Sequence, residues 1–192
     1  MSLGKVWNWD DELAEVEERI ERLSTSHPGL TEAAHPLLDR LKKLAEASPP
    51  DPNVPSHGSF RPAQVLLYKD QIGFIDFDTF CQSEPANDLA LFLSALMSIA
   101  MTNTDFDETR DSGSTMDEET RKARFELAMS LSEQFLDEYE KHRPISRQRV
   151  ALWETLDIFM LVLHGWIKVK VGELSDILYL LERFLQAKKF VG

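Results

Sequence analysis

The stretch HGSFRPAQVLLYKDQIGFIDFD, residues 57–78, carries the strongest signal in this sequence of 192 residues. It opens with a His-Gly pair in a polar loop, and two short apolar runs follow at residues 64–68 and 72–77. Lys69-Asp70-Gln71 separates the runs as a turn, so the stretch predicts a β-hairpin. The second run ends in Asp-Phe-Asp. A polar loop beside a hairpin that ends in carboxylates is typical of sites that hold a metal ion against phosphate groups.

Six other segments have the apolar spacing or the start and stop signals of helices. They are residues 10–24, 31–47, 85–101, 117–142, 146–171 and 174–187. The Pro-rich residues 48–55 end helical structure after the second of these segments. Residues 102–119 are acidic and short of large apolar side chains, so we expect a mobile insertion there. The predicted fold is therefore mostly α, with one small embedded β-hairpin.

Composition excludes some classes of partner. The formal net charge is −12 and the sequence pI is near 4.8, which argues against nucleic acid or an anionic membrane. An acidic surface favours cationic partners, although solubility alone also explains this charge. Cys81 is the single cysteine, and we interpret it as a structural or incidental thiol in a reducing, cytoplasmic setting. The sequence contains neither an apolar run long enough to span a membrane nor a secretory signal.

Three positions in the loop fall at the spacing of a catalytic loop for phosphoryl transfer: His57, Ser59 and Gln64. The later segments IDFD, residues 75–78, and PANDLALFL, residues 85–93, extend the pattern. On these residues the chain resembles the aminoglycoside phosphotransferase and choline kinase-like family of small-molecule kinases. That family's pattern reads His-Gly-Asp, four residues, Asn, a strand ending in Asp-Phe/Trp-Asp, and a helix that starts with Asp-Leu-Ala. The match covers about a fifth of the chain, residues 57–93.

The resemblance implies a fold and a set of site residues. The fold would be the C-terminal lobe of the protein kinase-like fold, and the activity would be Mg²⁺-dependent phosphoryl transfer from ATP to a hydroxyl acceptor. Asp76 would be the principal metal ligand, Gln64 would stand at the second ligand position, and Ser59 at the position of the catalytic acid. His57 would brace the loop, Asp88 would hold it by hydrogen bonds, and Asp78 would be a further metal ligand or a surrogate acid.

Most of these residues also have an ordinary structural interpretation. His57 fits a hydrogen-bonded turn residue, Asp88 fits an acid in the first turn of a helix, and Asp78 fits a turn former. Asp76 is harder to explain in this way, because a carboxylate in the apolar run GFIDF is costly to bury unless it is paired or bound to metal. The metal-site interpretation therefore depends most on Asp76.

Two departures from the family pattern predict an impaired site. A serine hydroxyl at position 59 is not a base at neutral pH, and the loss of a positioned base typically costs about 10²- to 10⁴-fold in rate. Gln64 is longer than Asn by one methylene, which shifts its oxygen by about an ångström where Mg²⁺ needs near-ideal geometry. Two alternatives follow: a pseudokinase-like binding module without turnover, and an unrelated helical interaction protein whose hairpin only imitates the pattern.

The glycines form neither a Gly-x-Gly pair nor a Walker-type loop, so we expect the N-terminal nucleotide lobe to be absent from these residues. Residues 1–4 look like an artificial start, and we expect the natural chain to begin upstream.

A candidate lining for the acceptor pocket is residues 153–173. Its aromatic and His residues are Trp153, Phe159, His164 and Trp166. Glu154 and Asp157 in this stretch would meet a cationic acceptor, whose identity the sequence does not give. The competing interpretation is an amphipathic core helix, and the apolar spacing favours it.

Overall fold

The structure is a computed structural model that describes residues 4–26, 28–101, 117–167 and 171–188. For residues 165–167 and 171–177 it describes the backbone alone. Most of the expected insertion at 102–119, and residues 1–3 of the expected artificial start, lie outside the described residues.

The described part of the chain is mostly helical, as the sequence predicts. Its helices are α1 (Trp9–Ser24), α2 (Pro28–Glu46), α3 (Pro85–Met101), α4 (Glu118–Glu140), α5 (Arg147–Ile167) and α6 (Val171–Ala187), with a 3₁₀ turn at Pro62–Gln64. Its strands are β1 (Lys5–Val6), β2 (Val54–Ser56), β3 (Val65–Tyr68), β4 (Gln71–Phe74) and β5 (Cys81–Ser83). Helix α2 begins three residues before the predicted start, because Pro28 suits the first turn of a helix, where its missing N–H is not needed.

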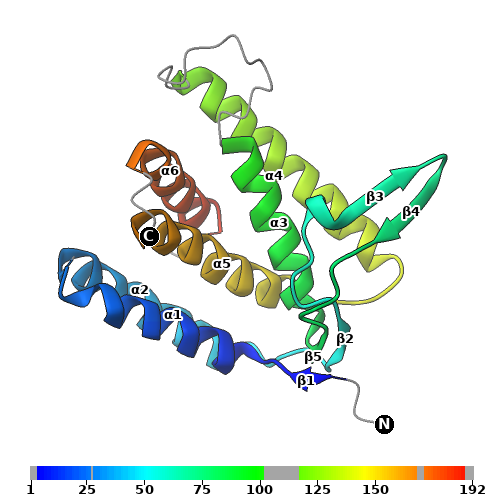
Figure 1. Ribbon diagram of the computed structural model, residues 1–192, viewed down its shortest axis with the longest axis horizontal. Helices are drawn as coiled ribbons and strands as arrows, with labels where there is room; N and C mark the ends of the chain where they lie inside the picture. The colour runs from blue at the N-terminus through cyan, green and yellow to red at the C-terminus, as the bar shows by residue number, and fades with distance from the viewer. Residues whose placement is uncertain (1–3, 27, 102–116, 168–170, 189–192) are drawn as a thin grey trace.

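Helix α5 lies at the centre of the bundle and packs against α1, α2, α3 and α6, while α4 packs on α3 (Figure 1). The main core joins apolar side chains of α1, α2, α3 and α5. Among them are Val16, Leu41, Leu93, Leu152 and Leu156, each at most 1% exposed. Burying one such side chain contributes about 1.5–3 kcal/mol. A second cluster joins α3, α4, α5 and α6 around Met97 and Phe184.

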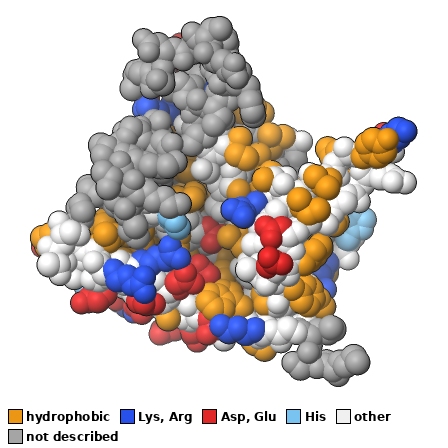
Figure 2. Space-filling view, viewed as in Figure 1, with side chains coloured by type: hydrophobic (Ala, Val, Ile, Leu, Met, Phe, Trp, Pro, Cys, Tyr) orange, Lys and Arg blue, Asp and Glu red, His pale blue; other side chains and the backbone are white. Residues whose placement is uncertain are grey.

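The predicted hairpin is present and projects away from the helices (Figure 1). Strands β3 and β4 pair in antiparallel register, with Val65 opposite Phe74 and Tyr68 opposite Gln71. Hydrophobic side chains are visible on its surface (Figure 2). Leu67 is 77% exposed and Ile72 is 64% exposed. The second strand ends at Phe74, three residues before the predicted end.

The expectation of a single hairpin was incomplete, because the chain also forms a three-stranded sheet in the order β1–β5–β2. Strand β5 pairs in parallel with β1 and antiparallel with β2. These strands have two or three residues each, too few for an alternating pattern to be visible in sequence. The sheet places the start of α1 beside the loop at residues 57–64. None of the helices in the described ranges is long and apolar enough to cross a membrane.

Candidate functional site

The loop at the start of the 57–78 stretch is fixed by the first turn of α3. The Asp88 carboxylate accepts hydrogen bonds from the backbone N–H of His57 at 2.6 Å and of Gly58 at 2.8 Å. Burial raises the pKa of Asp88, and these two hydrogen bonds oppose that rise. The helix-start acid is thus positioned where the resemblance implies, as an acceptor for loop amides.

Gly58 allows the loop to pack tightly on the segment after the hairpin. Its φ is +79°, a left-handed conformation that favours glycine. A Cβ atom at this position would overlap the carbonyl oxygen of Thr79 and would lie 3.3 Å from Cys81 Sγ. The Thr79 hydroxyl also donates to the carbonyl oxygen of His57 at 3.2 Å. Cys81 is buried, and burial raises the pKa of its thiol, which suits the structural role expected for it.

Gln64 connects the loop to the end of the hairpin. Its amide nitrogen donates to Ser59 Oγ at 3.2 Å and to Asp76 Oδ2 at 3.1 Å. Its amide oxygen accepts from the backbone N–H of Arg61 at 2.9 Å. A flipped amide would place NH₂ against that N–H and oxygen against the carboxylate, so the partners fix the orientation. The oxygen expected to be the second metal ligand is therefore turned toward Arg61.

Asp76 follows the strand in a left-handed backbone conformation, with φ of +70°. The preceding residue is held on both sides, because the Ile75 N–H donates to the Gln64 carbonyl at 3.2 Å and the Ile75 carbonyl contacts His57 Nε2 at 2.9 Å. Asp76 is exposed, as are Ile75 and Phe77. The sequence argument from the cost of a buried carboxylate therefore does not apply to Asp76, because this side chain is exposed. The left-handed backbone conformation of Asp76 still indicates a functional position, because strained backbone is common at such sites.

The His57 ring lies beside the hydroxyl group of Ser59. Its Nδ1 is 3.3 Å from Ser59 Oγ, and its other nitrogen faces the Ile75 carbonyl. The ring also contacts that of Phe77, with centroids 4.5 Å apart. The structure thus brings His57, Ser59, Gln64 and Asp76 into one hydrogen-bonded chain.

Asp78 lies apart from that chain. It is exposed and lines a pocket of about 410 Å³ that is bounded by Gly58, Thr79 and Asn87, and to which Ser59, Gln64 and Asp76 do not contribute. Its roles as a metal ligand and surrogate acid stay predictions.

Whether the site could bind a metal ion depends on Asp76. Within the described ranges, no group of three or more His, Cys, Asp or Glu side chains is placed to hold one. Mg²⁺ is commonly bound by one or two carboxylates, with phosphate oxygens and water completing its shell. The exposed Asp76 carboxylate fits that mode, whereas an all-protein site does not fit these residues.

The stretch at residues 153–173 does not supply the expected acids to a pocket. Glu154 and Asp157 on α5 are 1% and 7% exposed. Burial raises the pKa of Glu154 to about 8 and the pKa of Asp157 well above its ordinary value. Trp153 and Phe159 belong to the main core. For these four residues the core-helix interpretation is the one that the structure matches, whereas His164 is exposed and the Trp166 side chain lies outside the described part.

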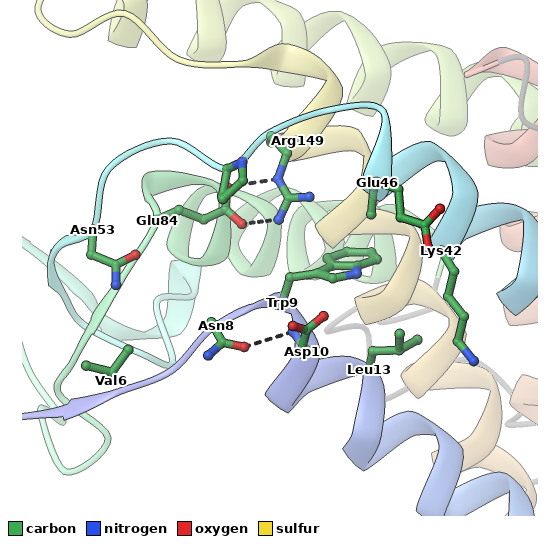
Figure 3. Close-up of a pocket in the computed structure, with 12 residues that line it drawn as sticks. Val6, Asn8, Trp9, Asp10, Leu13, Lys42, Glu46, Asn53, Glu84 and Arg149 are labelled. Carbon is green, nitrogen blue, oxygen red and sulfur yellow. Dashed lines mark hydrogen bonds and ion pairs between the residues drawn. The ribbon is translucent and has the colours of Figure 1, made fainter.

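A buried ion pair between Glu84 and Arg149, which the sequence analysis did not predict, supports the helix that holds the loop. Glu84, just before α3, accepts two hydrogen bonds from the Arg149 guanidinium on α5 and one from Trp153 Nε1 at 2.6 Å. Figure 3 shows this pair beside Trp9, at the edge of a pocket of about 550 Å³. The pair joins the start of α3, and hence Asp88, to the central helix. The two partners are 65 residues apart in the sequence, so no local pattern predicts the pair.

Helix α3 holds the loop through Asp88, and the Gln64 amide joins the loop to the Asp76 carboxylate at the end of the hairpin. Phosphoryl transfer depends on positioned groups and on charge neutralisation, and a loop and a carboxylate held in this way suit both needs. This layout is the one that the resemblance to phosphotransferases implies. A family model described as "Phosphotransferase enzyme family" (APH) matches residues 5–125, which is more than half of the chain. The chain belongs to the phosphotransferase enzyme family. Among curated proteins, none matches it.

Proposed function

We propose that this site transfers the γ-phosphoryl group of ATP, with Mg²⁺, to a hydroxyl group of a small molecule, at a rate limited by the missing carboxylate at position 59. The observation that carries the proposal is the Ser59–Gln64–Asp76 chain of hydrogen bonds. It links the acceptor side of the loop to the carboxylate at the hairpin end.

The residues divide the work as follows. Asp76 would hold Mg²⁺, which neutralises phosphate charge and orients the donor. The Gln64 amide binds both Asp76 and Ser59. Asp88 and the left-handed Gly58 fix the backbone conformation of the loop. Ser59 carries no charge to orient an attacking hydroxyl, and this supports a slow reaction.

A candidate acceptor pocket lies beside the loop, in the cavity of about 410 Å³. Among the described residues that line it, Glu12, Glu15 and Asp78 carry carboxylates and Lys5 carries the one cation. Asn87, only 3% exposed, also lines it, and its Nδ2 has no hydrogen-bond partner. A cationic compound that carries hydroxyl groups, such as an amino alcohol, matches both features, since carboxylates bind the cation and the amide can donate to a hydroxyl.

The pocket's negative charge depends on its surroundings. Burial raises the pKa of Glu12, and the hydrogen bond from Trp7 Nε1 at 3.0 Å opposes that rise. A bound cation would favour the charged form of this carboxyl group. We therefore propose that acceptor binding strengthens as Glu12 ionises.

A non-catalytic binding module is the second candidate function. It is favoured by the orientation of Gln64, whose oxygen is engaged by Arg61 and turned away from Asp76. In this case the pocket would bind its ligand and no phosphoryl group would move.

Nucleotide binding and turnover separate these functions. Asp76→Asn should abolish Mg²⁺-dependent ATP binding, measured by calorimetry, while the exposed control Asp70→Asn at the hairpin tip should leave it unchanged. Equal binding by the parent protein and Asp76→Asn would contradict the metal role.

Ser59→Asp should raise phosphotransfer to a panel of amino alcohols, because it restores a base of about 10²- to 10⁴-fold effect. A Ser59→Asp protein that binds ATP but stays inert with every acceptor would favour the binding module.

A further inference from the structure

We propose that Ser59 is a nucleophile, activated by His57, which itself accepts the phosphoryl group. The identity of the phosphoryl donor in this proposal rests on the proposed function. The nucleophile and its base rest on the hydrogen bonds of the loop.

The hydrogen bonds around His57 define where its proton resides. Nε2 lies 2.9 Å from the Ile75 carbonyl oxygen, which can only accept, so Nε2 carries the hydrogen. In the neutral ring Nδ1 is then unprotonated and accepts from the Ser59 hydroxyl at 3.3 Å. A serine hydroxyl directed at the bare nitrogen of a held imidazole is the pairing that activates serine nucleophiles.

The position of the ring is itself enforced. Asp88 holds the His57 backbone N–H, Thr79 donates to its carbonyl oxygen, and the Phe77 ring packs on the imidazole. The histidine is 8% exposed, so water competes little for its Nδ1. A base held by a third group is the arrangement expected of an activated nucleophile.

Ser59 Oγ keeps a lone pair for attack. It donates one hydrogen bond to His57 and accepts one from Gln64 Nε2, and a hydroxyl oxygen has two acceptor sites. The same Gln64 amide binds Asp76, so a phosphoryl group held near Asp76 lies within two hydrogen bonds of this oxygen. Ser59 as a residue is half-buried, so it is not fully enclosed by the protein.

The covalent step balances as follows. The Ser59 Oγ lone pair forms a bond to the γ-phosphorus of a nucleoside triphosphate, and the bond from that phosphorus to the bridging oxygen breaks. The electron pair of the broken bond leaves with the nucleoside diphosphate. The hydroxyl proton moves to His57 Nδ1, and the Asp88 carboxylate, which interacts electrostatically with His57, offsets part of the imidazolium charge.

A fluorophosphonate probe tests the nucleophile without nucleotide or metal, so its outcome is independent of the proposed function. We expect the native protein to form one covalent adduct, located on Ser59 by peptide mass spectrometry and absent from Ser59→Ala. His57→Gln keeps an amide that can donate to the Ile75 carbonyl but removes the base. It should slow labelling by about 10²-fold or more. Asp70→Asn, at the exposed tip of the hairpin, should label at the parent rate.

Three results would overturn the proposal. The first is an absence of adduct on Ser59 in the native protein, and the second is labelling of His57→Gln at the parent rate. Should His57→Gln fail to fold, the parent protein in urea replaces it, and equal labelling of Ser59 in the native and unfolded states would show that the fold does not activate it. The third is a native protein that labels but forms no phosphoserine at residue 59 with ATP and Mg²⁺ although it binds them.

Discussion

Gly58 is the single residue on which the geometry of the loop depends most. Its left-handed backbone and its close approach to Thr79 leave no room for a Cβ atom. We predict that Gly58→Ala lowers the free energy of unfolding by about 2–4 kcal/mol, from backbone strain and overlap together. Urea denaturation measures the loss. Gly29, whose added Cβ would meet nothing within 4 Å, provides the control, and a Gly29→Ala variant as damaged as Gly58→Ala would contradict this account.

Asp88 makes a second residue-level contribution, through the two backbone amides that it binds. Hydrogen bonds to a charged group are worth about 1.5–3 kcal/mol each, so Asp88→Ala should cost about 2–3 kcal/mol after partial replacement by water. The amide hydrogens of His57 and Gly58 should also exchange faster. Asp88→Asn keeps one acceptor oxygen and should lose less. Unchanged exchange at both amides in Asp88→Ala would show that the loop is held by other contacts.

Residue spacing was sufficient to predict that Ser59, Gln64 and Asp76 lie close together. It was not sufficient to predict how they interact. The Gln64 amide is oriented by the backbone N–H of Arg61, and no side-chain pattern records a backbone donor. The exposure of Asp76 was also missed, because an apolar run reads the same whether the hairpin is covered or projects into solvent.

At the scale of elements, the Glu84–Arg149 pair joins the start of α3 to α5. Removing one partner of a buried pair leaves an uncompensated charge, and we predict that Arg149→Met costs about 3–5 kcal/mol of unfolding free energy. The double variant Glu84→Gln/Arg149→Met should recover at least about 1 kcal/mol of this, since the buried charge is gone and Trp153 keeps an acceptor. A double variant that is less stable than Arg149→Met would rule out this coupling. Chemical denaturation of four proteins, the parent, Glu84→Gln, Arg149→Met and the double variant, completes the cycle.

The elements differ in how far the sequence predicts them. Helices α1 and α3 have long apolar faces and clear start signals, so their bounds agree with the prediction within about a residue. The sheet of β1, β2 and β5 was missed because its pairing is long-range and its strands are very short. That sheet brings Lys5 and Glu12 to the pocket beside the loop, so the proposed acceptor pocket was missed with it.

At the scale of the whole molecule, the buried carboxyl groups give stability a common dependence on pH. Burial raises the pKa of Glu12, Asp88, Glu154 and Asp157. A carboxyl group of this kind keeps its proton in the folded state at a pH where the unfolded chain has released it. The unfolded state then binds fewer protons, so stability falls as pH rises. The lowered pKa values of the exposed Asp117 and Glu138 act in the opposite direction, but only in acid, below about pH 4.5.

For Glu154 the window runs from its ordinary value of 4.5 to about 8 in the folded protein. Across it, this one group should lower the unfolding free energy by up to about 1.4 kcal/mol per pH unit. We predict that Glu154→Gln flattens the profile between pH 5 and pH 8, measured by urea denaturation, whereas Glu21→Gln on the exposed face of α1 leaves it unchanged. A parent protein whose stability rises steadily from pH 5 to pH 8 would contradict the prediction. Such a rise would mean that the α5 carboxyl groups reach water or a cation when folded, and that the central helix is less tightly enclosed than its packing indicates.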